Sequence, residues 1–408
     1  MTTNNISYMT QVASGNYNPA SKTRWETKLL KIAMGKLVAS KFARTEAVQK
    51  GDGTVQFSRF LRPAVVTSAI TEGVTYGIAD AKQLTLNKLT VTPAMWGDVY
   101  AFSDRTDPLT FISKEQGREV IAGVMAQSFD RELLRLISTR GLRHRIDADA
   151  TYTESGTATS GSTTVLANTG GLAQADSAWV GGFLTITNAS GPNYDITRKI
   201  TASDQSDTNV TVTEAFPQAM TTSSKYRAVV GTGIVAGDKL TTIGLMDVQG
   251  LHNKLQTVRF PGGLLRGFID AAQERDLMDD TSWLNHAVYD GAGSNALNNY
   301  GIARWCGVEL MIGSETHRES VAGVADQATG AVYVAPIFGA DAYSVLHWGN
   351  GGTGDFGVEF LYKEGPDSSD LLNSFTSIGW KGLWAGEVLR ATSVIGLMTG
   401  ATSQNILV

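Results

Sequence analysis

The chain has 408 residues, of which 42% are hydrophobic and 18% are charged, and its formal net charge is -5. A chain of this length can bury a sizeable core and is expected to divide into more than one module. The mildly acidic balance does not favour recognition of a nucleic-acid sequence, the single cysteine excludes an internal disulfide, and no apolar run is long enough to span a bilayer.

The N-terminal segment is polar and then becomes basic. Its first residues are rich in Asn, Ser and Thr and lack the layout of a signal peptide, so a soluble protein made in the cytoplasm is expected. A helix is predicted over 23–42, where Thr23 and Glu26 can form a capping box. Two interpretations of the basic residues stay open: a solvated helix face, or contact with an anionic surface such as DNA. The residues concerned include Lys22, Arg24, Lys28, Lys31 and Lys36.

Residues 51–104 are predicted to form a long β-hairpin. Val55 and Phe57 alternate with polar residues in the outgoing arm, and the return arm, LTLNKLTVTPAMWGDVYAFSD, shows the same period of two. Pro93 cannot donate to a ladder and should lie at an edge or a bulge. The tip, TSAITEGVTYGIADAKQ, is long for a loop of a compact domain. Because an isolated ribbon is marginally stable in water, something else is expected to cover it.

The clearest element is a helix over 107–140. Asp107 can cap it, Pro108 suits its first position and Gly141 suits its end. Its apolar residues keep the helical period over a length that exceeds most globular helices. We therefore expect a long strut.

Composition changes sharply over 151–231, where Thr, Ser, Gly and Ala dominate and short strands alternate with turns. Turn signals at this spacing are typical of small sandwiches and barrels, so an inserted, surface-exposed β-rich module is predicted. Two helices, over 240–258 and 270–289, and several strands should follow. The final stretch, FTSIGWKGLWAGEVLRATSVIGLMTGAT, has the composition of closing sheet strands.

The sequence motifs do not favour an enzyme. GTGIVAGDK at 231–239 lacks the spacing of a phosphate loop, and a turn is the better interpretation. His144, Asp147 and Asp149 could group around a metal, but a polar strand or loop is favoured. Ser314, His317 and Glu319 lie close in sequence without a nucleophile elbow, and Cys306 is expected to pack in the core. No cofactor and no metal site is expected.

Six short segments of the sequence, taken in chain order, resemble segments of tailed-bacteriophage major capsid proteins of the Hong Kong 97-type fold. The resemblance is more narrowly to the phage N-four-type family. The segments are TRWETKLLKIA, GDGTVQFSRF, ITEGVTYG, WGDVYAFSD, ERDLMDDTSWLN and IGWKGLWAGEVLRA. The resemblance spans most of the chain, although the segment 151–231 is less like the common core. It implies an α+β fold with an N-terminal arm, an extended loop, a spine helix, peripheral and axial domains and an inserted β module.

This resemblance also implies a division of the chain and a set of contact residues. The expected units are the arm at 1–50, the extended loop at 51–104, the spine helix and start of the peripheral domain at 105–150, the inserted module at 151–231, the axial domain with parts of the peripheral sheet at 232–370, and closing strands at 371–408. The extended loop is expected to lie over a neighbouring subunit, so that its apolar strands are covered in trans. The expected contact residues are Arg59, Arg62, Ile70, Glu72, Gly73 and Tyr76.

The function implied is that of a major capsid protein that assembles into an icosahedral shell around double-stranded DNA. Implied partners are further copies in hexamers and pentamers, portal, scaffolding and decoration proteins, and DNA bound without sequence specificity through the basic arm; no membrane is involved. Implied locations are the bacterial cytoplasm during assembly and the virion afterwards. The alternative is a secreted or tail-associated β-rich adhesin that binds glycans, which the Ser/Thr/Gly-rich module would suit.

Overall fold

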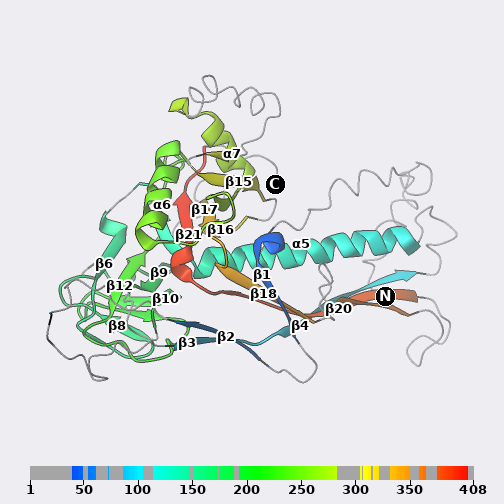
Figure 1. Cartoon of the computed structure of the whole chain (residues 1–408), viewed down its shortest axis with the longest axis horizontal. Coiled ribbons are helices and arrows are strands. Elements are labelled where there is room, and N and C mark those ends of the chain that lie inside the picture. The colour runs from blue at the N-terminus through cyan, green and yellow to red at the C-terminus, as the bar shows by residue number, and fades with distance from the viewer. Residues whose placement is uncertain are drawn as a thin grey trace, which may run out of the picture.

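A computed structural model describes most of the chain beyond the N-terminal segment. The described residues are 39–48, 54–60, 72, 86–103, 114–147, 150–172, 174–187, 193–282, 304–305, 307–313, 316–320, 331–348, 358–363 and 375–402. A long central helix has one sheet beneath it, while a second sheet with two helices and a separate β module gather at its C-terminal end (Figure 1).

The central helix α5 (Lys114–Arg140) corresponds to the strut predicted from the sequence. At about 1.5 Å per residue its described part is roughly 40 Å long. It ends at Arg140, as the following glycine predicted, and a Cβ on Gly141 would lie only 2.7 Å from Cγ1 of Val394. Its buried face carries Phe129, Leu133 and Ile137, which are spaced by one turn each.

The first sheet lies against that face of α5. It has the order β1 (Arg44–Val48), β18 (Tyr343–Trp348), β20 (Phe375–Val388) and β19 (Val358–Lys363), and β4 (Ala94–Ser103) also pairs with β20. β1 runs parallel to β18, and the other pairs are antiparallel. Two tryptophans of β20, Trp380 and Trp384, pack on Phe129 with ring centroids 5.4 Å away in each case.

The end of the predicted N-terminal arm is part of this body. The 3-10 helix η1 (Ala39–Phe42) lies against α5, where Asp130 accepts a hydrogen bond from the backbone N–H of Ala39 at 2.9 Å. The hydroxyl of Tyr343 donates to the carbonyl of Ala39 at 2.6 Å. Lys22, Arg24, Lys28, Lys31 and Lys36, the predicted basic set, lie outside the described residues.

The predicted hairpin is present at its base, with two corrections. β2 (Val55–Phe60) and β3 (Leu86–Val91) form an antiparallel ribbon. Beyond Pro93, however, the return arm continues as β4 and pairs with β20 instead of β2, because the chain turns into the first sheet there. The expectation that neighbours alone cover the ribbon is also wrong at its base: Phe57 and Val91 are buried against Leu346 of the same chain.

The second sheet lies at the C-terminal end of α5. Its order is β14 (Arg304–Trp305), β15 (Val308–Ile312), β13 (Leu265–Ile269), β17 (Ala331–Phe338), β21 (Val394–Thr399) and β5 (Leu142–Arg145), with β16 (Arg318–Ser320) beside β17. The closing stretch of the chain is therefore divided between two sheets: β20 belongs to the first and β21 to the second, with the 3-10 helix η4 (Ala391–Ser393) at the corner.

Helices α6 (Thr242–Leu255) and α7 (Ala271–Met278) accompany the second sheet and begin at side-chain caps. Thr241 accepts from the N–H of Gly244, and Asp270 forms a capping box with Gln273. The apolar residues of α6 and of the sheet make one buried cluster that includes Leu245, Val248, Leu265, Ile337 and Leu397. No helix within the described ranges is long and apolar enough to cross a membrane.

The strands within the predicted module form a sheet of their own. Its order is β6 (Thr153–Thr157), β12 (Lys225–Val229), β9 (Phe183–Ile186), β10 (Thr197–Asp204), β11 (Asn209–Val212), β8 (Val165–Ala167) and β7 (Ser160–Gly161), preceded by the 3-10 helix η3 (Ala150–Tyr152). Its apolar side chains pack on one another, with Trp179, Leu184 and Tyr226 at most 1% exposed. Independent folding of this module stays a prediction.

A buried histidine makes the stability of this fold depend on pH. His252 of α6 bonds to the hydroxyl of Thr257 at 2.9 Å and to the carbonyl of Ile337 at 3.2 Å. Burial lowers the pKa of His252 from 6.5 to about 4. Because the folded chain then disfavours the charged ring, the stabilisation is complete above pH 6.5 and is lost as the pH falls toward 4.

We expect the contribution of His252 to lower the free energy of unfolding by on the order of 2 kcal/mol between pH 7 and pH 5. His252→Gln should be less stable than the parent at pH 7 but should lose less stability over this interval. Chemical denaturation at both pH values measures the difference. Equal pH dependence in parent and variant would contradict this role for His252.

Candidate functional site

The residues predicted to contact a neighbouring subunit lie mostly outside the described ranges. Arg59 belongs to β2, where its backbone is opposite Asn87 of β3, and Glu72 is exposed in a turn. Arg62, Ile70, Gly73 and Tyr76 lie outside the described residues. The structure therefore describes the base of the extended loop, and the predicted contact set stays a prediction.

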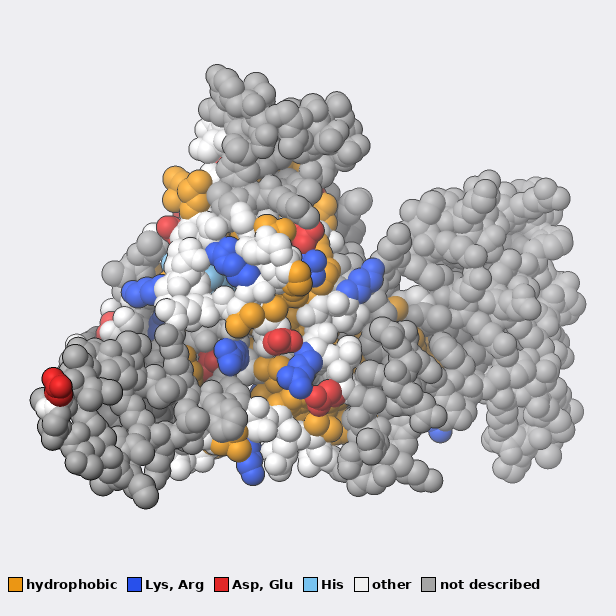
Figure 2. Space-filling model, viewed as in Figure 1, with side chains coloured by type: hydrophobic (Ala, Val, Ile, Leu, Met, Phe, Trp, Pro, Cys, Tyr) orange, Lys and Arg blue, Asp and Glu red, His pale blue; other side chains and the backbone are white. Residues whose placement is uncertain are grey.

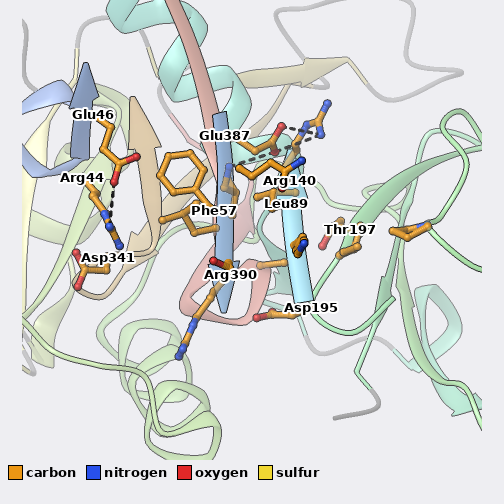
Figure 3. Close-up of a pocket in the computed structure, with 18 of the residues that line it drawn as sticks. Arg44, Glu46, Phe57, Leu89, Arg140, Asp195, Thr197, Asp341, Glu387 and Arg390 are labelled. Atoms are coloured by element: carbon orange, nitrogen blue, oxygen red, sulfur yellow. Dashed lines mark hydrogen bonds and ion pairs between the residues drawn. The ribbon is translucent and has the colours of Figure 1, made fainter. Parts of the chain in front are cut away.

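The described residues contain a different candidate, a charged groove where several elements meet. The groove has a volume of about 580 Å³ and lies between the base of the ribbon, β1, the ends of α5 and β20, and the module (Figure 3). Phe57 and Leu89 of the ribbon supply apolar lining. The charged lining residues are Arg44, Glu46, Lys88, Arg140, Asp195, Arg198, Asp341, Glu387 and Arg390.

Arg140 links three parts of the fold at one wall of this groove. Because it is the last residue of α5, its guanidinium extends beyond the helix and reaches both main-body and module carboxylates. Its Nη1 donates to both oxygens of Glu387 on β20 at 3.2 Å, and its Nη2 donates to Glu214 of the module at 3.2 Å. Arg198 of β10 pairs with the other oxygen of Glu214 at 3.3 Å.

Burial controls the electrostatics of this network. The side chain of Glu387 is 14% exposed, and burial raises its pKa although Arg140 and Arg198 oppose the rise. Burial, followed by the repulsion of Arg140, lowers the pKa of the Arg198 guanidinium. Glu214, by contrast, is 53% exposed. The most buried members of the network are thus Glu387 and Arg198, at 14% and 15% exposure, whereas Arg140 is half-buried and Glu214 lies on the solvent side.

A second hollow of about 710 Å³ shares Arg140, Thr197 and Arg198 with the first. It is lined by α5, the module and β16, with Glu132, Arg135, Phe183 and His317 among its residues. Cationic and anionic side chains also alternate over the described part of the face in Figure 2, with hydrophobic atoms between them. Such mixed-charge hollows suit contacts with other protein segments, which carry both signs of charge.

The motifs considered for chemistry have structural roles. His144 faces Arg227, with Nδ1 of the ring 3.2 Å from the guanidinium, and burial followed by Arg227 lowers the pKa of His144 to about 4. Asp147 pairs with Arg145. Among the described residues no group of three His, Cys, Asp or Glu side chains is placed to hold a metal. Asp149 lies outside the described residues.

The remaining motifs are likewise structural where they are described. Glu319 accepts from the buried Arg143 and lies 3.4 Å from His317, whereas Ser314 and Cys306 lie outside the described residues. The segment 231–239 forms two turns, in which Ile234 N–H donates to Gly231 and Asp238 N–H donates to Val235. The interpretation of this segment as a turn is therefore confirmed.

Sequence reasoning missed the groove and its charged network. Arg140 and Glu387 are 247 residues apart, and no spacing rule connects them. The single local signal was a basic residue in the last turn of a long helix, a position that favours cations.

Comparison with known proteins identifies the architecture. No protein-family model matches the sequence, and no curated protein matches it. Among solved structures, the chain is similar to the capsid of the cyanophage Pam1 (TM-score 0.52, 13% identity, covering 95% of this chain and 98% of that chain). It is also similar to the capsids of Ralstonia phage GP4 (0.51, 13%, 91% and 90%) and cyanophage P-SCSP1u (0.51, 11%, 90% and 89%). The predicted α+β phage capsid fold of the Hong Kong 97 type is confirmed.

The network around Arg140 predicts unequal effects of removing its charges. Arg140→Met leaves the buried Glu387 without its main partner, so we expect a loss of about 3 kcal/mol in the free energy of unfolding at pH 7. Glu214→Gln should cost less than about 1 kcal/mol, because that carboxylate is mostly in water. Adding Glu387→Gln to Arg140→Met should restore part of the loss. Equal effects of the two single variants in denaturant titrations would refute this ranking.

Proposed function

We propose that the chain is the major capsid protein of a tailed bacteriophage and assembles into the icosahedral shell that encloses double-stranded DNA. One observation carries the proposal: the chain and phage capsid chains share their fold over 95% and 98% of their lengths. A structural role also agrees with the ion pairs at the groove, in which Arg140 and Arg198 pair with Glu214 and Glu387. Closed shells arise when many copies repeat the same contacts.

The same fold match disfavours the glycan-binding adhesin. Its support was the Ser/Thr/Gly-rich composition of 151–231, but the similarity to capsid chains extends far beyond a common core. The proposed partners are therefore other copies of the chain in hexamers and pentamers, together with portal, scaffolding and decoration proteins. The proposed locations are the bacterial cytoplasm during assembly and the virion afterwards.

Electron microscopy of the purified, overexpressed chain tests the function. We expect shells, tubes or capsomers, with closed particles favoured when scaffolding and portal proteins are co-expressed. A stable monomer that forms no assemblies under these conditions and binds glycans on an array would overturn the proposal in favour of the adhesin.

The extended loop is proposed as the clasp between subunits, with Arg59, Arg62, Ile70, Glu72, Gly73 and Tyr76 as contact residues. Its base supports this role, because Phe57 and Val91 are anchored on Leu346 of their own chain.

Deletion of 69–79 should leave a folded, soluble subunit, since the described core clusters do not include these residues. It should abolish closed shells or lower their yield at least tenfold, because the clasp is missing. Circular dichroism checks the subunit, and particle counts by electron microscopy check assembly. Parental particle yield and heat stability from the deletion variant would refute the clasp.

The basic arm is proposed to contact packaged DNA through Lys22, Arg24, Lys28, Lys31 and Lys36. Neutralising phosphates with such residues gives binding that weakens with salt and ignores base sequence. Replacement of the lysines by glutamine should lower DNA retention and reduce its salt dependence, as measured on purified particles. Unchanged retention across a salt series would remove the arm from DNA contact.

A further inference from the structure

The module joins the body through two chain segments that lie side by side. The chain enters it after β5 and leaves it after β12, and the N–H of Val230 donates to the carbonyl of Tyr152 at 3.1 Å between the two segments. The first and last strands also pair, with Thr153 opposite Val229. A module held only at such a neck could rotate about it. The described contacts show three further attachments.

The first attachment stiffens the neck itself. Arg145 of β5 is 1% exposed, and its Nη1 donates to the carbonyls of Val230 at 2.5 Å and Thr232 at 2.7 Å. Its guanidinium also lies over the ring of Tyr152, 4.9 Å from the centroid. On the same strand, Arg143 lies over Phe183 of the module at 4.1 Å. Both arginines are on one face of β5, since they are two residues apart.

The second attachment is at the corner between β20 and β21. Asp195 of the module is 5% exposed, and its carboxylate accepts a hydrogen bond from the N–H of Thr392 in η4. Its carbonyl accepts from the N–H of Ala391 at 3.4 Å. Asp195 has φ +68°, a conformation that costs a non-glycine residue about 1 kcal/mol or more. The hydrogen bonds to Thr392 and Ala391 therefore hold Asp195 in its left-handed backbone conformation.

The third attachment is the network of Arg140, in which Glu214 and Arg198 of the module meet the ends of α5 and β20. Figure 3 shows Arg140 and Glu387 of this network together with Asp195, all lining the same groove. The three attachments thus reach different elements of the body: β5, η4 and the end of α5.

These three elements all lie where the chain passes between the two sheets of the body. The chain passes from the first sheet and its helix to the second sheet at Gly141, between α5 and β5, and again at η4, between β20 and β21. The described chain also crosses between the sheets from β17 to β18. We propose that the module is a brace: by gripping the crossings at Gly141 and η4 it fixes the angle between the spine helix and the second sheet. Resting on the proposed capsid function, we add that this angle sets the curvature at which subunits meet.

The test weakens the brace without unfolding the module. Asp195→Ala combined with Glu214→Ala removes the side-chain acceptors of the second and third attachments. Asp195→Asn keeps an acceptor oxygen and tolerates the positive φ, and serves as the conservative variant. Asp207→Ala, in an exposed turn of the module, is the matched control.

Hydrogen exchange on the unassembled subunit is the first measurement. In the double variant we expect amides 139–145 and 389–393 to exchange at least tenfold faster than in the parent, while β9–β12 stay protected; the control and Asp195→Asn should resemble the parent. Unchanged exchange at both crossings would overturn the brace. Loss of protection in β9–β12 as well would also overturn it, because the residues would then be needed for the fold of the module.

Electron microscopy of particles is the second measurement, and it separates the brace from the capsid proposal. We expect the double variant to give particles with a distribution of diameters at least twice as wide as the parent. Faster exchange with parental diameters would overturn the control of curvature. If the parent itself forms no assemblies, the proposed function fails, whereas the exchange data still decide whether the module braces the subunit.

Discussion

Packing of α5 on β20 positions most of the other elements of this subunit. Phe129 meets Trp380 edge-on and Trp384 at a tilt, and Leu133 and Ile137 continue the same face at 1% and 0% exposure. Burying a side chain of this size contributes about 1.5–3 kcal/mol, so these three residues of the helix together contribute roughly 5–9 kcal/mol. β4 is fixed in turn, because Trp96 packs edge-to-face on Trp384 at 5.9 Å. The position of the ribbon is fixed in turn, because β3 ends at Val91 and β4 begins at Ala94.

Charged groups occupy the seams between these packed units. Arg143, Arg145 and Arg140 each pair with a carboxylate of the body, and each also contacts the module: Arg143 at Phe183, Arg145 at the Val230 carbonyl and Arg140 at Glu214. Buried ion pairs add little net stability, since desolvation offsets much of their attraction. Displacement of the module is nevertheless costly, because Arg145 would lose its hydrogen bond to the carbonyl of Val230 and Arg140 would lose Glu214. Apolar packing thus holds each unit together, while the charges specify how the units join.

The elements that the sequence predicts well are those with local signals. The strut, its end at Gly141 and the composition of the module follow from periodicity, a turn residue and a change in residue types. The pairing of β4 with β20 could not be predicted, because their partners are some 280 residues apart and alternation looks the same for either pairing. Arg143 and Arg145 were missed for a related reason. In the polar run RHRIDADA they resemble a surface strand, and contacts with residues distant in sequence, Phe183 and Glu319 for Arg143 and Val230 for Arg145, accompany their burial.

The two faces of β4 differ in exposure, and the exposed face bears on the proposed shell. Trp96 and Tyr100 point toward the core, whereas Met95 and Val99 on the other face are 67% and 69% exposed. An exposed apolar side chain on its own needs no explanation, but two on one face of a strand at the edge of a sheet are a liability for a monomer. Exposed apolar faces are typical of surfaces through which copies of a protein contact one another. The subunit therefore keeps its own core on the side of α5, and β4 carries apolar residues on the side that remains open.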